Sequence, residues 1–132
     1  MFGRRSDNKP QNRIDSLIGA GTRVEGNIVF TGGLRVDGEI KGNIMAAEGA
    51  SSSTLVLSEL ARIEGSVNVA HFVANGTVIG PVTVTESLEM QQKSRIVGDV
   101  DYALIEIHQG AVIEGRMVHR GKSVELKLAA SN

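Results

Sequence analysis

A seven-residue pattern, small–x–apolar–x–Gly–x–apolar, recurs along the chain and limits the folds that the chain can adopt. Its six copies, in which Thr22 and Leu34 take the small place of the first two, are TRVEGNI (22–28), LRVDGEI (34–40), ARIEGSV (61–67), GTVIGPV (76–82), SRIVGDV (94–100) and AVIEGRM (111–117). Between them lie short extended runs, which open at nearly equal intervals with Leu55, Phe72, Leu88 and Leu104. This repeat is too short for paired helices but fits one turn of a β-solenoid.

The residue types also favour strands. No window shows a sustained helical period, and Val, Ile and Thr are abundant. We therefore expect an all-β fold, a solenoid of about six coils over residues 17–118, with residues 1–16 and 119–132 as disordered tails.

The glycine of each copy needs a physical reason, because glycine weakens an ordinary strand. In a solenoid, coils stack at about 4.8 Å, so a tight corner has room only for hydrogen or requires a positive φ. A glycine column at a corner is therefore expected, consisting of Gly26, Gly38, Gly65, Gly80, Gly98 and Gly115. Unrelated hairpin turns would not hold glycine at a fixed offset between two apolar residues.

The glycines are unevenly spaced near the start of the chain. The interval from Gly26 to Gly38 is shorter than the later ones, and the interval from Gly38 to Gly65 is much longer. This unevenness predicts an incomplete first coil and a loop at AAEGASSST (46–54).

Composition excludes several functional classes. Lys plus Arg number 14 against 15 Asp plus Glu, so no basic excess favours nucleic acid, and the absence of Cys removes thiol chemistry and Cys-based zinc sites. Three Phe, one Tyr and no Trp disfavour a sugar-binding groove. His71, His108 and His119 show no metal-binding spacing and are expected at the surface. We expect no catalytic residue, no cofactor and no metal.

The start of the chain is polar and lacks the apolar stretch of a secretory signal, and no run reaches the roughly 18 apolar residues of a membrane span. These features predict a cytoplasmic protein.

Two kinds of β-helix compete. Ile18, Val24, Phe30 and Val36 lie six apart, as in left-handed hexapeptide acyltransferases, which would trimerise, carry a catalytic histidine and bind an acyl donor. The later signature glycines, from Gly65 to Gly115, lose this strict multiple of six, and a variable coil length favours a right-handed solenoid. A monomeric carbohydrate-binding solenoid is a third possibility, weakened by the scarcity of aromatic residues.

A polar tail beginning Met-Phe, followed by GTRVEGNIVFTGGLRVDGEIKGNI and by coils of the ARIEGSV type, resembles the bactofilins over residues 17–118. The resemblance implies a right-handed, three-sided parallel β-helix that polymerises without nucleotide into non-polar filaments. It also implies attachment to the inner face of the cytoplasmic membrane and a scaffold role for cell-wall synthesis or hydrolysis proteins in bacterial cell shape.

The open ends of a solenoid must be capped or used for assembly. Joining like ends gives isologous contacts and a filament without polarity. The expected interface residues are Val24, Ile28, Phe30, Leu34 and Val36 at one end and Leu104, Ile107, Ile113, Met117 and Val118 at the other. The alternation of Val124, Leu126 and Leu128 leaves open whether the C-terminal tail shields an end or docks a partner.

The N-terminus suggests a membrane contact. Met1 and Phe2 would insert at a bilayer surface while Arg4 and Arg5 meet anionic head groups. The residues alone favour an inert disordered tail, and the resemblance reverses that preference in favour of membrane attachment.

Overall fold

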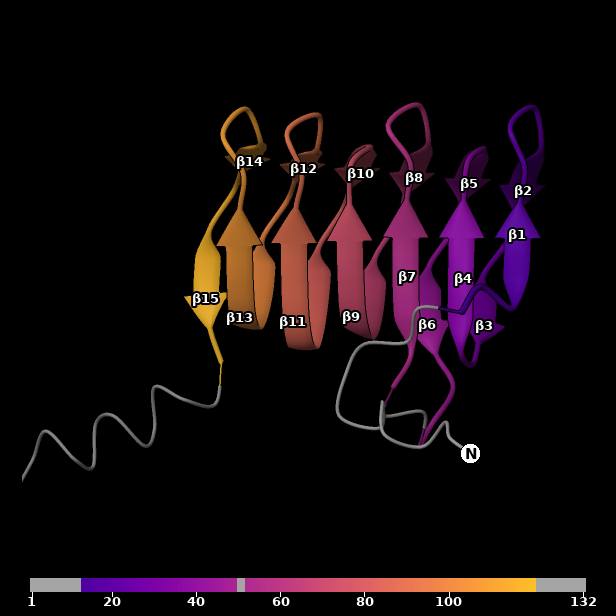
Figure 1. Ribbon diagram of the computed structural model, residues 1–132, viewed down its shortest axis with the longest axis horizontal. Coiled ribbons are helices and arrows are strands. Elements are labelled where there is room, and N and C mark those ends of the chain that lie inside the picture. Colours follow the sequence, from indigo (N-terminus) through magenta and orange to yellow (C-terminus); the bar gives the residue numbers. More distant parts are fainter. Residues whose placement is uncertain (1–12, 50–51, 121–132) are drawn as a thin grey trace, which may run out of the picture.

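The computed structural model describes residues 13–49 and 52–120, and every regular element in these ranges is a β-strand (Figure 1). The strands are β1 (Ser16–Ile18), β2 (Arg23–Glu25), β3 (Ile28–Phe30), β4 (Gly33–Val36), β5 (Glu39–Lys41), β6 (Ile44–Ala46), β7 (Thr54–Leu57), β8 (Arg62–Glu64), β9 (Val67–Ala74), β10 (Thr77–Ile79), β11 (Val82–Met90), β12 (Arg95–Val97), β13 (Val100–Ile107), β14 (Val112–Glu114) and β15 (Met117–His119). All pair in parallel, which confirms the all-β solenoid.

Three walls enclose the solenoid. The first wall stacks β1, β4 and β7 with the second halves of β9, β11 and β13. The second wall has the order β14-β12-β10-β8-β5-β2. The third stacks β3, β6, the first halves of β9, β11 and β13, and β15. β9, β11 and β13 therefore each turn a corner and join one coil to the next.

Together these walls form about six coils, and they coil in the expected right-handed sense. The chain rises along the near wall, returns along the fainter far side and advances from the indigo end to the yellow end (Figure 1). A right-handed crossover between parallel strands is the sense that strand twist favours.

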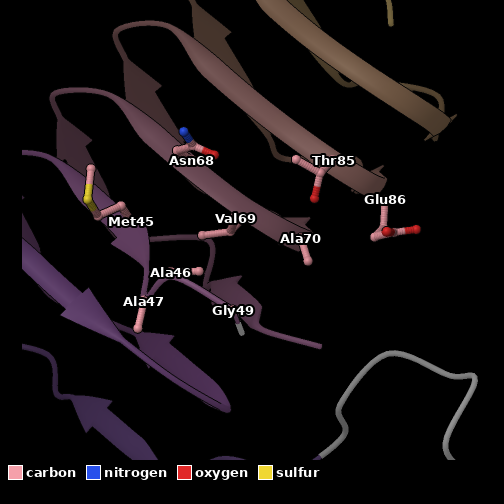
Figure 2. Close-up of a pocket in the computed structure, with 9 residues that line it drawn as sticks. All are labelled: Met45, Ala46, Ala47, Gly49, Asn68, Val69, Ala70, Thr85 and Glu86. Atoms are coloured by element: carbon pink, nitrogen blue, oxygen red, sulfur yellow. The ribbon is translucent and has the colours of Figure 1, made fainter. Parts of the chain in front are cut away.

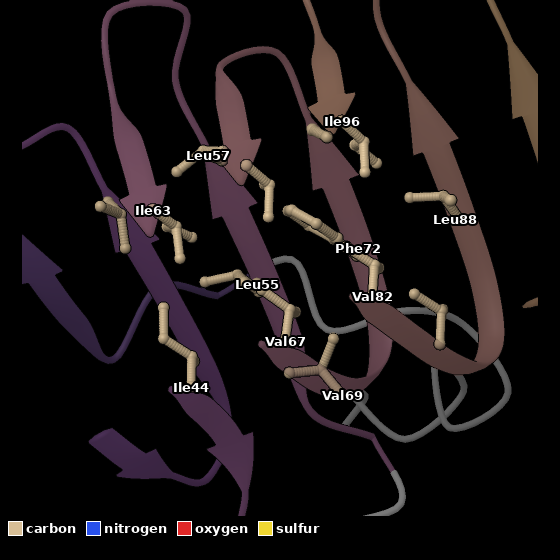
Figure 3. Packing of buried hydrophobic residues seen from close by; sticks show 14 of the residues in the cluster. Ile44, Leu55, Leu57, Ile63, Val67, Val69, Phe72, Val82, Leu88 and Ile96 are labelled. Carbon is tan, nitrogen blue, oxygen red and sulfur yellow. The ribbon is translucent and has the colours of Figure 1, made fainter. Parts of the chain in front are cut away.

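The core consists of inward side chains stacked in register. One column runs through all six coils of the second wall and contains Val24, Ile40, Ile63, Val78, Ile96 and Ile113. A first-wall column places Leu55, Phe72 and Leu88 on one another, and these side chains point into the interior in Figure 3. All three are at most 1% exposed. Burial of this aliphatic surface is the main stabilising term, since each fully buried side chain contributes about 1.5–3 kcal/mol.

The glycine column exists, but one predicted member is wrong. The register places Gly26, Gly42, Gly65, Gly80, Gly98 and Gly115 one above the next, because a Cβ on each later glycine would collide with the carbonyl oxygen of the glycine before it. At Gly80 the φ angle of 144° also lies where side chains are disfavoured. Only hydrogen fits at the five later positions of this column.

Gly38, the incorrect member, lies at the preceding corner, between β4 and β5. A Cβ there would meet the carbonyl oxygens of Thr22 and Gly19 instead. The true second copy of the pattern is GEIKGNI (38–44), so the interval from Gly26 to Gly42 matches that of the later coils. The first coil therefore has all three of its strands, contrary to the prediction.

The predicted loop is present between β6, which ends at Ala46, and β7, which begins at Thr54. The third-wall ladder confirms the departure of the chain here, since β6 pairs with β9 only through Ile44 and Met45. The extra residues of this loop account for the long interval between Gly42 and Gly65.

The outer surface of the second wall is charged. Arg23 and Glu25 lie 3.1 Å apart, and Arg62 and Glu64 lie 2.8 Å apart. The hydrogen bond from Arg62 lowers the pKa of the Glu64 carboxyl. Solvent screens such exposed pairs, so this wall is a solvated surface and not the source of stability.

Candidate functional site at the two ends of the solenoid

The ends differ from the interior in having unpaired strand edges. Among the described residues, β1, β2 and β3 have no neighbour on one side, and neither do β14, β15 and the second half of β13 on the other. Unpaired edges beside apolar interiors favour further pairing. These two surfaces are the candidate functional site.

At the N-terminal end, the first coil presents its inward side chains to the opening. They are Ser16, Ile18, Val24, Ile28 and Phe30. Ile18, Val24 and Ile28 are partly buried against the core, and Phe30 is 8% exposed. The opening at this end is therefore lined mainly by apolar side chains that are only partly exposed to solvent.

Asp15 fixes the start of the first coil. Its carboxylate Oδ2 accepts a hydrogen bond from the Gly33 N–H at 2.9 Å, and its own N–H donates to the Gly33 carbonyl at 2.8 Å. The Gly33 N–H lowers the pKa of the Asp15 carboxyl, and Arg13, 3.1 Å away, acts in the same direction. The reciprocal bonds hold β1 against β4 at this edge.

At the C-terminal end, the last coil presents a second apolar surface. Its inward positions are Ile105, Ile107, Ile113, Met117 and His119. Ile107 is 47% exposed and Met117 is 43% exposed, although the residues beneath them, Met90 and Val100, are fully buried. The His119 ring stacks on Tyr102, with centroids 5.4 Å apart. This end is the more open of the two.

The structure places only some of the predicted interface residues on these surfaces. Val24, Ile28 and Phe30 point inward in the first coil, and Ile107, Ile113 and Met117 do so in the last.

Leu34 and Val36, in contrast, belong to the second coil, where β4 lies between β1 and β7, and they are at most 2% exposed. They cannot reach an end-on partner.

Leu104 and Val118 point outward. Leu104 pairs with Ser87 on the outer row of the first wall and is 61% exposed, so the inward row of Leu55, Phe72 and Leu88 continues to Ile105. Val118 pairs with Asp101 on the outside of the third wall.

Sequence reasoning missed Ser16, Ile18, Ile105 and His119. The misplaced second glycine hid the first two, because it assigned Val36 to the end in place of Ile18. Ile105 was missed because the first-wall interval lengthens by a single position after Leu88, since four residues join β11 to β12 where only two join β9 to β10. Counting back from Gly115 would have located it.

The predicted membrane-contacting residues Met1, Phe2, Arg4 and Arg5 lie outside the described residues. In the part of the chain that the structure describes, no helix is long and apolar enough to cross a membrane.

One group of metal-ligand types gathers on the outer first wall. His108 Nε2 lies 3.2 Å from both Glu89 and Glu106. All three side chains are at least one-third exposed, and the imidazole lies between the two carboxylates. The group therefore is an exposed polar cluster on the outer surface.

A hollow of about 390 Å³ lies beside the loop that follows β6 (Figure 2). Met45 and Ala47 line it from the loop side, Val69 and Ala70 from β9, and Glu86 from the β11 bulge. It is a shallow recess of the outer wall, and its described lining residues include no pairing of a nucleophile with a base.

Comparisons with known proteins agree with this geometry. A family model described as "Bactofilin: Polymer-forming cytoskeletal" matches residues 16–118. Bactofilin BacP of Myxococcus xanthus (strain DK1622) is 26% identical over 106 residues, which cover 80% of this chain and 42% of that protein. The chain thus spans less than half the length of this relative. No solved structure matches the chain significantly.

Proposed function

Because the chain belongs to the bactofilin family of polymer-forming cytoskeletal proteins, we propose that it assembles end to end, without nucleotide, into non-polar filaments. The family is structural, and it gives no support to the acyltransferase and carbohydrate-binding alternatives. The filament itself would be the functional unit, a scaffold on the inner face of the cytoplasmic membrane that positions cell-wall-modifying enzymes.

One observation supports assembly above all others: inward columns that are fully buried inside the solenoid stop at exposed apolar side chains. One such first-wall column consists of Ile18, Val36, Leu57, Ala74, Met90 and Ile107. Its inner members are at most 1% exposed, whereas Ile107 is 47% exposed. Covering an exposed isoleucine stabilises a contact by up to about 1.5–3 kcal/mol. A second copy placed on the end supplies that cover.

Like ends meet in the proposed filament, C-terminal coil to C-terminal coil and N-terminal coil to N-terminal coil. Each contact is then isologous, and the filament has no polarity. This part of the proposal comes from the family resemblance.

Single arginine substitutions at the two ends of one column test both assembly and polarity. Ile18→Arg blocks the N-terminal contact and Ile107→Arg the C-terminal contact, because each would leave a charge desolvated in the interface. We expect wild type to form filaments, each single variant to stop at dimers, and the double variant to be monomeric, as measured by electron microscopy and analytical ultracentrifugation.

Head-to-tail assembly would make each single variant monomeric, and this result would overturn the like-to-like contact. Discrete wild-type trimers would overturn filament formation itself. Ile79→Arg is the matched control, since Ile79 is 36% exposed on the outer wall of an interior coil and its replacement leaves both ends intact. Circular dichroism of every variant should remain β-rich.

Membrane attachment through the N-terminal tail is the second part of the proposal. One tail with Met1, Phe2, Arg4 and Arg5 would bind weakly, but a filament displays many tails and gains avidity. We expect Phe2→Ala to release filaments from anionic liposomes in a co-sedimentation assay while leaving assembly unchanged. Unchanged co-sedimentation with liposomes would contradict tail-mediated binding.

The enzyme-positioning role has its own test in cells. If the filament is the scaffold, Ile107→Arg should disperse fluorescently labelled cell-wall-modifying enzymes from their normal sites, whereas Ile79→Arg should not. Normal enzyme localisation with the assembly-blocked variant would argue against the scaffold.

A further inference from the structure

The second half of β13 is the last strand of the first wall and has a free edge (Figure 1). Residues Leu104–Ile107 pair with β11 on one side, and no described strand pairs with them on the other. Their inward side chains, Ile105 and Ile107, lack the covering residue that every earlier coil has in these two columns. An additional strand at this edge would complete the coil.

The last described residues of the chain lead towards this edge. β15 pairs with the first half of β13 as far as Tyr102, and the next residue, Arg120, donates its N–H to the Tyr102 carbonyl at 2.8 Å. One coil earlier, the chain passes from Tyr102 through Ala103 directly into the first-wall strand at Leu104. Residues after Arg120 therefore start where a seventh first-wall strand begins.

The sequence that follows has the pattern of a half-buried strand. In SVELKL (123–128), Val124, Leu126 and Leu128 alternate with Glu125 and Lys127. Two apolar residues spaced by two match the spacing of Ile105 and Ile107 across a parallel ladder. Gly121 and Lys122 provide extra length at the corner, where β11 already carries an extra residue.

We propose that residues 123–128 form a seventh first-wall strand that caps the C-terminal end, with Val124 over Ile105 and Leu126 over Ile107. This inference rests on the proposed function for its consequence, because the cap covers the surface that the C-terminal filament contact uses. The segment is tethered only a few residues away, so its effective concentration at the edge is high. The cap therefore competes with a second copy and limits filament growth at one end.

The test uses the full chain with Ile18→Arg, in which the C-terminal contact alone remains. Val124→Ser with Leu126→Ser removes the apolar cover without adding charge. Glu125→Ser with Lys127→Ser is the matched control at the outward positions. Hydrogen exchange of residues 104–107 is measured below the dimerisation concentration, and dimerisation is measured by ultracentrifugation.

We expect the Val124/Leu126 variant to exchange about tenfold faster at residues 104–107 and to dimerise at about tenfold lower concentration, with the control unchanged. Unchanged exchange would overturn the cap. Weaker dimerisation of the Val124/Leu126 variant would also overturn it, because the segment would then be part of the filament contact. Faster exchange without dimers in any variant would support the cap and contradict the proposed function.

Discussion

The interior coils and the terminal coils have mostly apolar inward residues in the same columns, but they differ in how far those residues are covered. Ile63 and Ile113 occupy one column of the second wall, but Ile63 is fully buried and Ile113 is only partly buried. In the interior, each coil has a neighbour on both sides and its side chains supply stability. At the ends, one neighbour is missing, and the same apolar residue types form the surface that we propose for assembly.

The proposed contact would give a repeat protein a binding surface without a specialised motif. Apart from His119, the inward side chains of the last coil are apolar like those of the fourth, so the main change is the loss of a neighbour. The ends also differ from each other, since Asp15 bonds reciprocally to Gly33 at the first coil, while Ile107 and Met117 remain nearly half-exposed at the last. Stability and assembly should therefore respond to different substitutions.

The largest expected difference is in the free energy of unfolding of two single alanine variants, one at an interior position and one at an end position of the same column. In the monomeric Ile18→Arg/Ile107→Arg background, we expect Ile63→Ala to lower the free energy of unfolding by about 2–5 kcal/mol, because it leaves a cavity between two coils. Ile113→Ala should cost about 1 kcal/mol or less, since the site is already open on one side. Urea denaturation measures both, and equal losses would show that the end coil is packed like the interior.

Alanine substitutions in the glycine column should give a smaller difference in stability between an interior coil and an end coil. Gly80 and Gly26 have similar φ angles of 144° and 141°, but a Cβ at Gly80 meets the Gly65 carbonyl whereas a Cβ at Gly26 meets nothing within 4 Å. Both alanine substitutions cost about 1–2 kcal/mol of backbone strain. We expect Gly80→Ala to lose about 1–3 kcal/mol more, through displacement of the coil beneath.

Thermal unfolding of the two glycine variants in the same monomeric background measures this difference. Similar melting temperatures would mean that φ strain alone selects glycine in the column. Gly38→Ala is an informative third variant, because this glycine contacts backbone at the other corner without needing a positive φ.

The sequence predicted the solenoid because repetition reveals which residues share an environment. Val and Ile two positions before and after Gly65, Gly80 and Gly98 identified the inward rows of the second and third walls correctly. The prediction was wrong where the sequences of two successive corners, each with a glycine, fit the same repeat pattern. Gly38 and Gly42 both fit the pattern, and only the register of β5 against β2 and β8 separates them.

The ends were harder to predict than the repeat for the same reason. Which residue faces an opening depends on the coil to which it belongs, and a shift of one glycine moved Leu34 and Val36 from the second coil to the first. The longer connection between β11 and β12 shifted the row again, so that Leu104 replaced Ile105. Each bulge or extra loop alters which side chain points inward, and the local sequence does not signal it.

The smallest expected effect concerns a half-buried histidine on the outer face of an interior coil. His71 lies in β9 with its Nδ1 2.8 Å from the Ser87 hydroxyl, and burial by the adjacent coils lowers the pKa of its imidazole, which is only partly offset by Glu86. Below its ordinary pKa of about 6.5, the unfolded chain therefore binds more protons than the folded one. The free energy of unfolding should fall slightly as the pH drops from about 6.5 towards the lowered value, and this group should not affect it at higher pH.

Urea denaturation of the monomeric background at neutral and at mildly acidic pH measures this contribution. His71→Gln should show a shallower pH dependence, because glutamine does not titrate in this range. Ser87→Ala, which leaves the ring buried, should retain most of the dependence. An unchanged slope in His71→Gln would mean that the stacked coils do not shield this ring from water, and that the outer face of an interior coil is as exposed as that of an end coil.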